Sequence, residues 1–166
     1  MWGNDKMKTK IIMLVLIFFT SFFLSAETVL LYTMVDIDVI DEQQYGDLIE
    51  SAVMNEFFDA GHIVFNAEIS GEAPDRGMDY YKESDSLQMA KAGGAAFVLE
   101  VKLTYNEVKG KTLPDFAEYR FINVLSGNLI DEGSVSIDKK LVDKDDLEKG
   151  MAVMGSEVAD SVLNYL

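Results

Sequence analysis

Residues 92–105 read AGGAAFVLEVKLTY, and this stretch carries the strongest structural signal in the chain. Gly93 and Gly94 end a helical stretch, because glycine adopts at little cost the left-handed conformation that closes a helix. From residue 95 to 105, apolar side chains then alternate with others, a pattern typical of a strand with one buried face. The stretch therefore predicts a helix that leads directly into a long strand.

The segments before this stretch predict two strands and two helices. Residues 29–34 form an apolar run that is rich in β-branched and aromatic side chains, which indicates a buried strand. Asp41 precedes a helical repeat of apolar residues that ends at Gly61. Residues 63–67 suggest a second strand, and residues 79–92 a weaker helix.

The segments after it predict a hairpin and a last helix. A turn-rich segment surrounds Gly110 and Pro114. Residues 117–125 and 129–137 then flank the tripeptide SGN, a usual composition for a β-hairpin connection. From about residue 143 onward, an apolar stripe at helical spacing predicts the final helix.

The N-terminal segment has the organisation of a secretory signal peptide. Three lysines at residues 6–10 precede the apolar run 11–24, and the small residue Ala26 precedes the acidic Glu27. The apolar run is short for a membrane-spanning helix, which needs roughly 20 residues. We expect cleavage between Ala26 and Glu27, with an uncleaved anchor as the alternative, and Met7 would begin a cleaner signal.

The predicted elements follow the order strand, helix, strand, helix, strand, strand, strand, helix. This order favours an α/β (α+β) fold with a single mixed sheet of about five strands packed by three helices. After a signal peptide over residues 1–26, residues 27–166 are long enough for a single domain with one core.

The methionines Met89, Met151 and Met154 are interpreted as helix packing residues. The spacing predicts a core that includes Leu31, Leu48, Ile49, Val53, Phe57, Phe97, Leu99, Val101, Phe121, Val135, Val158 and Val162.

Composition excludes several classes of function. The net charge is -15, and removing residues 1–26, which carry one aspartate and three lysines, changes it to -17. Such a surface repels nucleic acid phosphates and anionic lipid head groups, so nucleic acid is not an expected partner. The chain has no cysteine, which excludes thiol catalysis, zinc–thiolate sites and the acylated cysteine of a lipoprotein. Attachment to a membrane would need an uncleaved N-terminal segment.

One acidic cluster deserves comparison with known metal sites. Asp36, Asp38, Asp41 and Glu42 follow the first strand, where ligands of open α/β sheets often bind, and a cation would relieve their repulsion. The glycine and the distant bidentate glutamate of an EF-hand loop are absent, however. We therefore expect a solvated acidic loop, no cofactor and no catalytic residue. The alternative is a metal-assisted or acid–base hydrolase that uses this loop.

Two other features also have structural interpretations. His62, the single histidine, follows the helix stop at Gly61, and neither a cysteine nor a serine in a nucleophile elbow accompanies it. It is interpreted as a capping or half-buried structural residue. Gly93 and Gly94 are interpreted as a left-handed helix cap, because phosphate-binding loops lead from a strand into a helix and these glycines do the reverse.

Two segments carry a resemblance to a known family. Residues 92–105 resemble the helix, Gly-Ala, strand passage of the periplasmic family that includes the N-terminal domain of TolB, the penicillin-binding-protein activator LpoB and the curli secretion protein CsgG. Residues 119–137, YRFINVLSGNLIDEGSVSI, are similar to that family's hairpin. The chain differs from the lipoprotein members in having no acylated cysteine, and from CsgG in lacking long alternating segments for a membrane barrel.

This resemblance implies an α/β fold and an accessory protein that binds other envelope proteins. Together with the charge, it leads us to expect a secreted or periplasmic protein whose partner has a basic surface.

The mature protein is predicted to begin at Glu27, because Ala26 is the small residue at the end of the apolar run. Mass spectrometry of the exported protein checks this. An intact chain recovered with membranes, still carrying residues 11–24, would show that the segment is an anchor.

Overall fold

The computed structural model describes residues 26–35, 42–67, 70–71, 85–108, 111–137 and 144–166. Most of the predicted signal peptide therefore lies outside the described residues. In chain order, the described elements are β1 (Thr28–Val35), α2 (Glu42–Asp59), β2 (Ile63–Asn66), β3 (Ser70–Gly71), α3 (Asp85–Gly93), β4 (Phe97–Val108), β5 (Lys111–Asn123), β6 (Leu129–Ser136) and α4 (Lys144–Leu163).

The described strands form one mixed sheet in the order β2-β1-β4-β5-β6. β1 is parallel to β2 on one side and to β4 on the other, whereas β4, β5 and β6 are antiparallel neighbours. The two-residue β3 pairs with the end of β1. The predicted fold class and element order are confirmed, and β3 is the one strand that the sequence pattern did not indicate.

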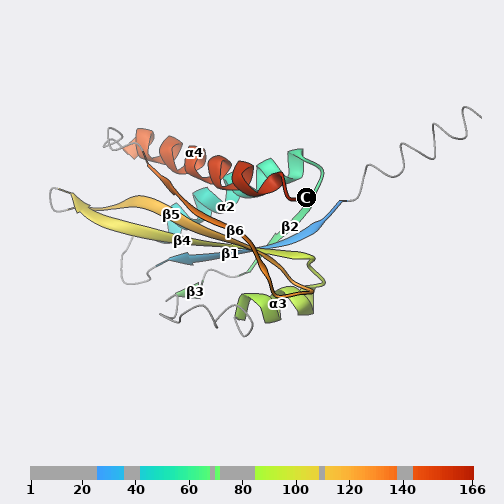
Figure 1. Ribbon diagram of the computed structural model, residues 1–166. Coiled ribbons are helices and arrows are strands. Elements are labelled where there is room, and N and C mark those ends of the chain that lie inside the picture. The colour runs from blue at the N-terminus through green and yellow to red at the C-terminus, as the bar shows by residue number, and fades with distance from the viewer. Residues whose placement is uncertain (1–25, 36–41, 68–69, 72–84, 109–110, 138–143) are drawn as a thin grey trace, which may run out of the picture.

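The three helices are divided between the two faces of the sheet. Figure 1 shows α2 and α4 on one side and α3 on the other. The chain moves outward from β1 to β2 through α2, and then back across β1 to β4 through α3. Crossovers between parallel strands are almost always right-handed. Two crossovers that lead in opposite directions across the sheet therefore place their helices on opposite faces. The strand order thus explains why α2 and α3 are separated.

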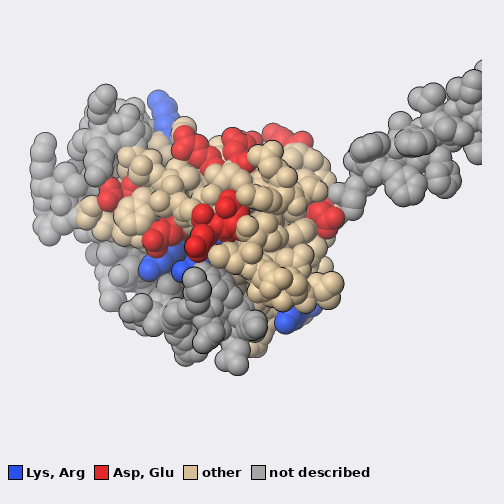
Figure 2. Space-filling view, in the orientation of Figure 1, with Lys and Arg blue, Asp and Glu red and all other residues tan. Residues whose placement is uncertain are grey.

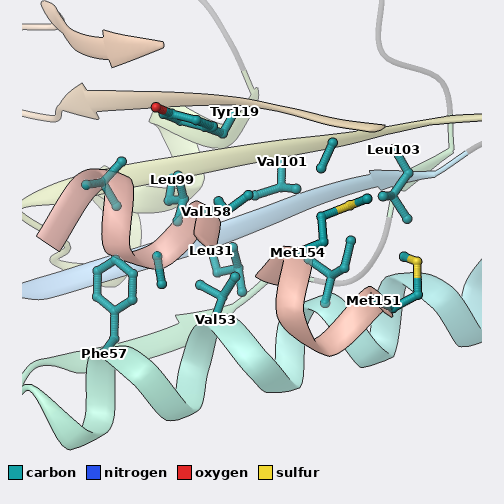
Figure 3. Packing of buried hydrophobic residues seen from close by; sticks show 14 of the residues in the cluster. Leu31, Val53, Phe57, Leu99, Val101, Leu103, Tyr119, Met151, Met154 and Val158 are labelled. Carbon is teal, nitrogen blue, oxygen red and sulfur yellow. The ribbon is translucent and has the colours of Figure 1, made fainter. Parts of the chain in front are cut away.

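The main core lies between the sheet and the pair α2 and α4, and Figure 3 shows its side chains converging from both layers. Of the twelve predicted core residues, nine are buried. The other three, Leu48, Phe97 and Val135, are partly buried and pack against the same cluster. The predicted stripe of α4 is fully confirmed, with low exposure at Leu147, Met151, Met154, Val158 and Val162.

Close approach between α2 and α4 depends on a glycine. A Cβ atom on Gly155 of α4 would lie 2.7 Å from the Cβ of Ala52 and 2.8 Å from the carbonyl oxygen of Ile49. Both distances are too short for non-bonded atoms, and the Ile49 oxygen belongs to the backbone. The two helices therefore touch along their backbones at this point.

A second core lies under α3, and it corrects the expectation of one buried face for residues 95–105. Val98 is fully buried and Glu100 is 2% exposed, although both point away from the main core. The reason is that α3 covers this half of β4 through Leu87 and Ala90. Beyond this covered part, Lys102 is exposed, as alternation predicts.

The prediction for the helix before this strand was partly wrong. The described helix begins at Asp85, and residues 79–84 lie outside the described residues. Met89, interpreted from helical spacing as a packing residue, is 42% exposed. The short α3 contacts the sheet through Leu87 and Ala90, which lie on another side of the helix from Met89.

The turn-rich segment around Pro114 is also corrected, because β5 already begins at Lys111. The β4–β5 register shifts between Thr104 and Tyr105, and Tyr105 pairs with Pro114. Pairing of β5 with β6 starts only at Phe116. Among the described strands, β5 therefore has a hydrogen-bonding neighbour at Pro114 on one side alone, and proline is tolerated at such edges and irregularities.

Replacing Leu99 by alanine should lower the free energy of unfolding by about 2–5 kcal/mol, because it leaves a cavity in a fully buried layer. The matched change Lys102→Ala on the same strand should have almost no effect, because that side chain is exposed. Denaturant titration of both variants checks this. Equal effects at the two positions would contradict the assigned orientation of β4.

Candidate functional site

The most unusual polar group among the described residues is a carboxylate in the middle of the sheet. Glu100 of β4 is 2% exposed. The hydroxyl group of Ser86, in the first turn of α3, donates a hydrogen bond of 2.5 Å to its Oε1 atom. The positive end of a helix dipole also favours a nearby negative charge. Glu100 therefore holds the start of α3 against the sheet.

Burial is the main influence on this carboxyl group. Burial raises the pKa of Glu100 above its ordinary value of 4.5, while the Ser86 hydrogen bond and the charge of Arg120 act in the opposite direction. Arg120 is the cross-strand neighbour of Glu100 on β5. The Oε2 atom of Glu100 is buried and has no hydrogen-bond partner within the described ranges. The group can thus take up a proton at higher pH than an exposed glutamate.

Charged side chains extend from this point across the sheet toward β6. Arg120 pairs with Glu100 on one side and with Glu132 of β6 on the other. One step along the strands, Lys102 pairs with Glu118. Directly paired residues share one face of a sheet, so these five side chains form a charged array on the α3 face. We call these five residues the charged face.

The charged face meets the edge of the sheet at β6. Within the described residues β6 pairs with β5 alone. Figure 2 shows acidic atoms gathered near the middle of the view, where β6 crosses in front in Figure 1, with basic atoms beside them. The edge therefore combines unpaired backbone with negative charge.

On the face of the sheet that is covered by α2 and α4, a tyrosine links β5 to β6. The hydroxyl group of Tyr119 donates a hydrogen bond of 3.2 Å to Asp131. A Cβ atom on Gly133 would lie 2.7 Å from the Tyr119 oxygen, so the ring fits only over a glycine. Burial is the first cause that raises the pKa of Tyr119. This contact fixes the position of β6 against β5.

The predicted acidic loop cannot be placed. Asp36, Asp38 and Asp41 lie outside the described residues, and Glu42 opens α2 with a side chain that also lies outside them. Across the part of the chain that is described, no group of three or more His, Asp or Glu side chains could hold a metal ion. The loop and its hydrolase alternative therefore stay predictions.

His62 has the structural position that was predicted. Gly61 adopts a φ of 87°, and the His62 and Gly61 amides donate to the carbonyl groups of Phe57 and Phe58, each at 2.9 Å. These two bonds form a Schellman cap at the end of α2. The His62 ring meets Phe57 edge-on, and its Nδ1 atom accepts a hydrogen bond of 3.3 Å from the Glu27 amide. The histidine thus joins the helix cap to the start of β1.

The two glycines after α3 have different tasks. Gly94 has a φ of 73°, and the Ala95 amide donates to the carbonyl group of Ala90, which confirms the predicted left-handed cap. Gly93 is needed for space, because a Cβ atom there would lie 2.7 Å from the ring of Phe65.

The buried carboxylate and the sheet edge were both missed by sequence reasoning. Glu100 lies in the apolar run FVLEV, and Val98 on the same face was the available signal that this face is covered. The pairing of Arg120 with Glu100 and with Glu132 needs the strand register, which the pattern of a single strand does not contain.

No protein-family model matches the sequence, and no curated protein sequence matches it. Solved structures do match. The chain is similar to PelC from Paraburkholderia phytofirmans, solved as a dodecamer, with a TM-score of 0.50 and 15% identity over 81% of this chain and 84% of that one. It is also similar to the LpoB C-terminal domain from Escherichia coli, with a TM-score of 0.45 and 14% identity over 69% and 84% of the two chains.

TolB from Acinetobacter baumannii is a further structural neighbour, with a TM-score of 0.45 and 9% identity over 86% of this chain and 29% of that one. TolB and LpoB, which the sequence resemblance named, are thus among the proteins whose solved structures match the chain. At these identities the likeness is one of fold alone. In addition, none of the described helices is both long and apolar enough to cross a membrane.

Replacing Glu100 by glutamine should make stability less dependent on pH. The folded-state pKa is raised, so the folded protein binds this proton more tightly than the unfolded chain does. The free energy of unfolding of the wild type should therefore fall as pH rises from 4.5 toward the folded-state pKa, and this contribution should vanish in Glu100→Gln.

Urea titrations across this pH range measure the effect. At neutral pH the variant should be as stable as the wild type or more stable, by up to about 1–3 kcal/mol, the cost of burying an unsatisfied polar group. The exposed Glu118→Gln is the control. An identical pH slope in wild type and Glu100→Gln would show that the buried carboxyl group does not titrate in this range.

Proposed function

We propose that this protein is a non-catalytic accessory protein of the bacterial cell envelope, which is exported and acts through protein–protein contacts. The observation that carries the proposal is an acidic surface on a well-packed α/β frame. Helix α2 has no lysine or arginine, its acidic residues Asp47 and Asp59 are exposed, and Figure 2 shows acidic atoms along the helical layer as well as beside β6. A surface of this kind favours a partner with a basic surface.

The proposed location follows from the N-terminal segment. Its lysines and apolar run support export to the periplasm or beyond, and the absence of cysteine supports a protein without lipid acylation. We also propose that residues 27–166 form a single domain that works without a cofactor. The hydrolase alternative depends on the loop from Asp36 to Glu42, and no observation in the described residues favours it.

Electrostatics and apolar contact would contribute differently to such binding. Long-range attraction between an acidic and a basic surface mainly raises the association rate. Short-range burial of apolar groups gives the lasting affinity, and the chain exposes large apolar side chains at Leu125 and Phe58, which are 96% and 78% exposed. Neither side chain is buried in the core of the fold.

A partner captured by the exported protein from its own envelope allows a direct test. The association rate should fall several-fold between low and physiological salt, because charges are screened beyond about 8 Å in physiological salt, while the dissociation rate should change little. Surface plasmon resonance at several salt concentrations measures both rates. A salt-independent association rate would exclude electrostatic steering. Turnover of a peptidoglycan or ester substrate, abolished by Asp36→Ala or Asp38→Ala, would instead assign the protein to the enzymes.

A further inference from the structure

We propose that the outer edge of β6, which pairs with no further strand among the described residues, binds an extended segment of a partner protein that carries lysine or arginine. The segment would be added to the sheet as a further strand. This inference rests on the proposed function and locates the binding on a defined part of the surface. Strand addition uses backbone hydrogen bonds for affinity and side-chain contacts for specificity.

The direction of the hydrogen bonds shows which backbone groups are free at this edge. Just beyond β6, the amide of Ile137 donates to the carbonyl group of Asp115 on the β5 side, at 3.0 Å. In an antiparallel pair, alternate residues bond to the same neighbour. Val135 and Gly133 therefore bond to β5, whereas the amide and carbonyl groups of Ser134 and Glu132 point away from it. These outward groups are ready to pair with an added strand.

The charge of the edge determines the kind of segment that fits. β6 contains Asp131 and Glu132 and no basic residue. Glu132 is exposed, and its neighbour on β5 is Arg120, whose other neighbour is the buried Glu100. An added strand would place a side chain directly opposite Glu132, where opposite charges stabilise a pair by roughly 0.2–1 kcal/mol and like charges destabilise it. A basic side chain fits this position.

The same argument disfavours a second copy of the chain at this edge. Two β6 strands paired antiparallel about a twofold axis through their acidic segment would bring Asp131 and Glu132 of one copy close to those of the other. The partner is therefore a different segment, with charge opposite to that of β6.

An apolar corner lies at the beginning of this edge. Leu129, the first residue of β6, is 37% exposed, and Leu125 in the preceding turn is 96% exposed. A segment laid along β6 would reach Leu129 and, beyond it, the turn. Apolar contact there would contribute affinity that persists in salt, whereas salt screens the attraction between charges.

The opposite edge of the sheet suits this role less well. β2 has four residues, half the length of β6, and its parallel pairing is slightly weaker per residue than antiparallel pairing. β6 therefore offers the longer ladder among the described strands.

The experiment compares two substitutions at one position. Ser134→Pro removes one outward amide hydrogen and leaves the bonds to β5 in place, whereas Ser134→Ala keeps that hydrogen. The probe is an end-blocked peptide of alternating lysine and valine, about as long as a typical strand of 5–6 residues. A peptide of alternating glutamate and valine is its control. Binding is followed by amide chemical shifts of the isotope-labelled protein, which also report whether each variant keeps its fold.

The lysine–valine peptide should bind the wild type and Ser134→Ala, shift the amides of residues 129–136 and bind more weakly as salt increases. Ser134→Pro should weaken this binding about tenfold, the value of one hydrogen bond of about 1.4 kcal/mol. Glu132→Gln, which leaves the backbone intact, should weaken it a few-fold. Unchanged binding by both Ser134→Pro and Glu132→Gln, shifts confined to α2 and α4, or equal binding of the glutamate–valine peptide would overturn the proposal.

Capture of a partner from the envelope distinguishes failure of this inference from failure of the proposed function. A partner captured equally by wild type and Ser134→Pro would reject the β6 edge and leave the accessory role standing. Failure of the wild type to capture any envelope protein would reject the accessory role itself.

Discussion

The fold depends on the parallel pairing of β1 with a strand on each side. β1 pairs with β2 and β4, and both of its faces are covered, with Val29 and Leu31 in the main core and Leu30 and Tyr32 in the core under α3. Parallel neighbours cannot be joined by a tight turn, so each needs a crossover helix. The position of β1 between them places these two helices on opposite faces. The antiparallel strands β5 and β6 then extend this sheet, and α4 joins α2 over its main core.

Much of this frame could be predicted because its signals are local. The alternation in residues 95–105, the helical stripes of α2 and α4, and the glycine stops at Gly61 and Gly94 each depend on neighbouring residues in the chain. The main core was found for the same reason, since its members repeat with the period of their own element.

What could not be predicted depends on contacts between distant segments. Burial of Val98 and Glu100 requires α3 to lie over them, and Met89 is exposed because that short helix contacts the sheet by another side. Pro114 lies within a strand because β6 has already ended beside it. The candidate surface was missed in the same way, because the charged face exists only once β4, β5 and β6 are in register. Periodicity along one segment contains none of this information.

The contact between Gly155 and α2 has a consequence for how the chain reaches its native state. Residues 49 and 155 touch along their backbones, although most of the chain separates them. Until α4 has been synthesised, the sheet face that carries Leu99 and Val101 has no complete cover. Contacts between such distant residues slow folding, because a large loop must close before they form. The domain therefore completes this core only after the chain has been synthesised through residue 163, and a chain without α4 would leave this apolar sheet face in contact with water.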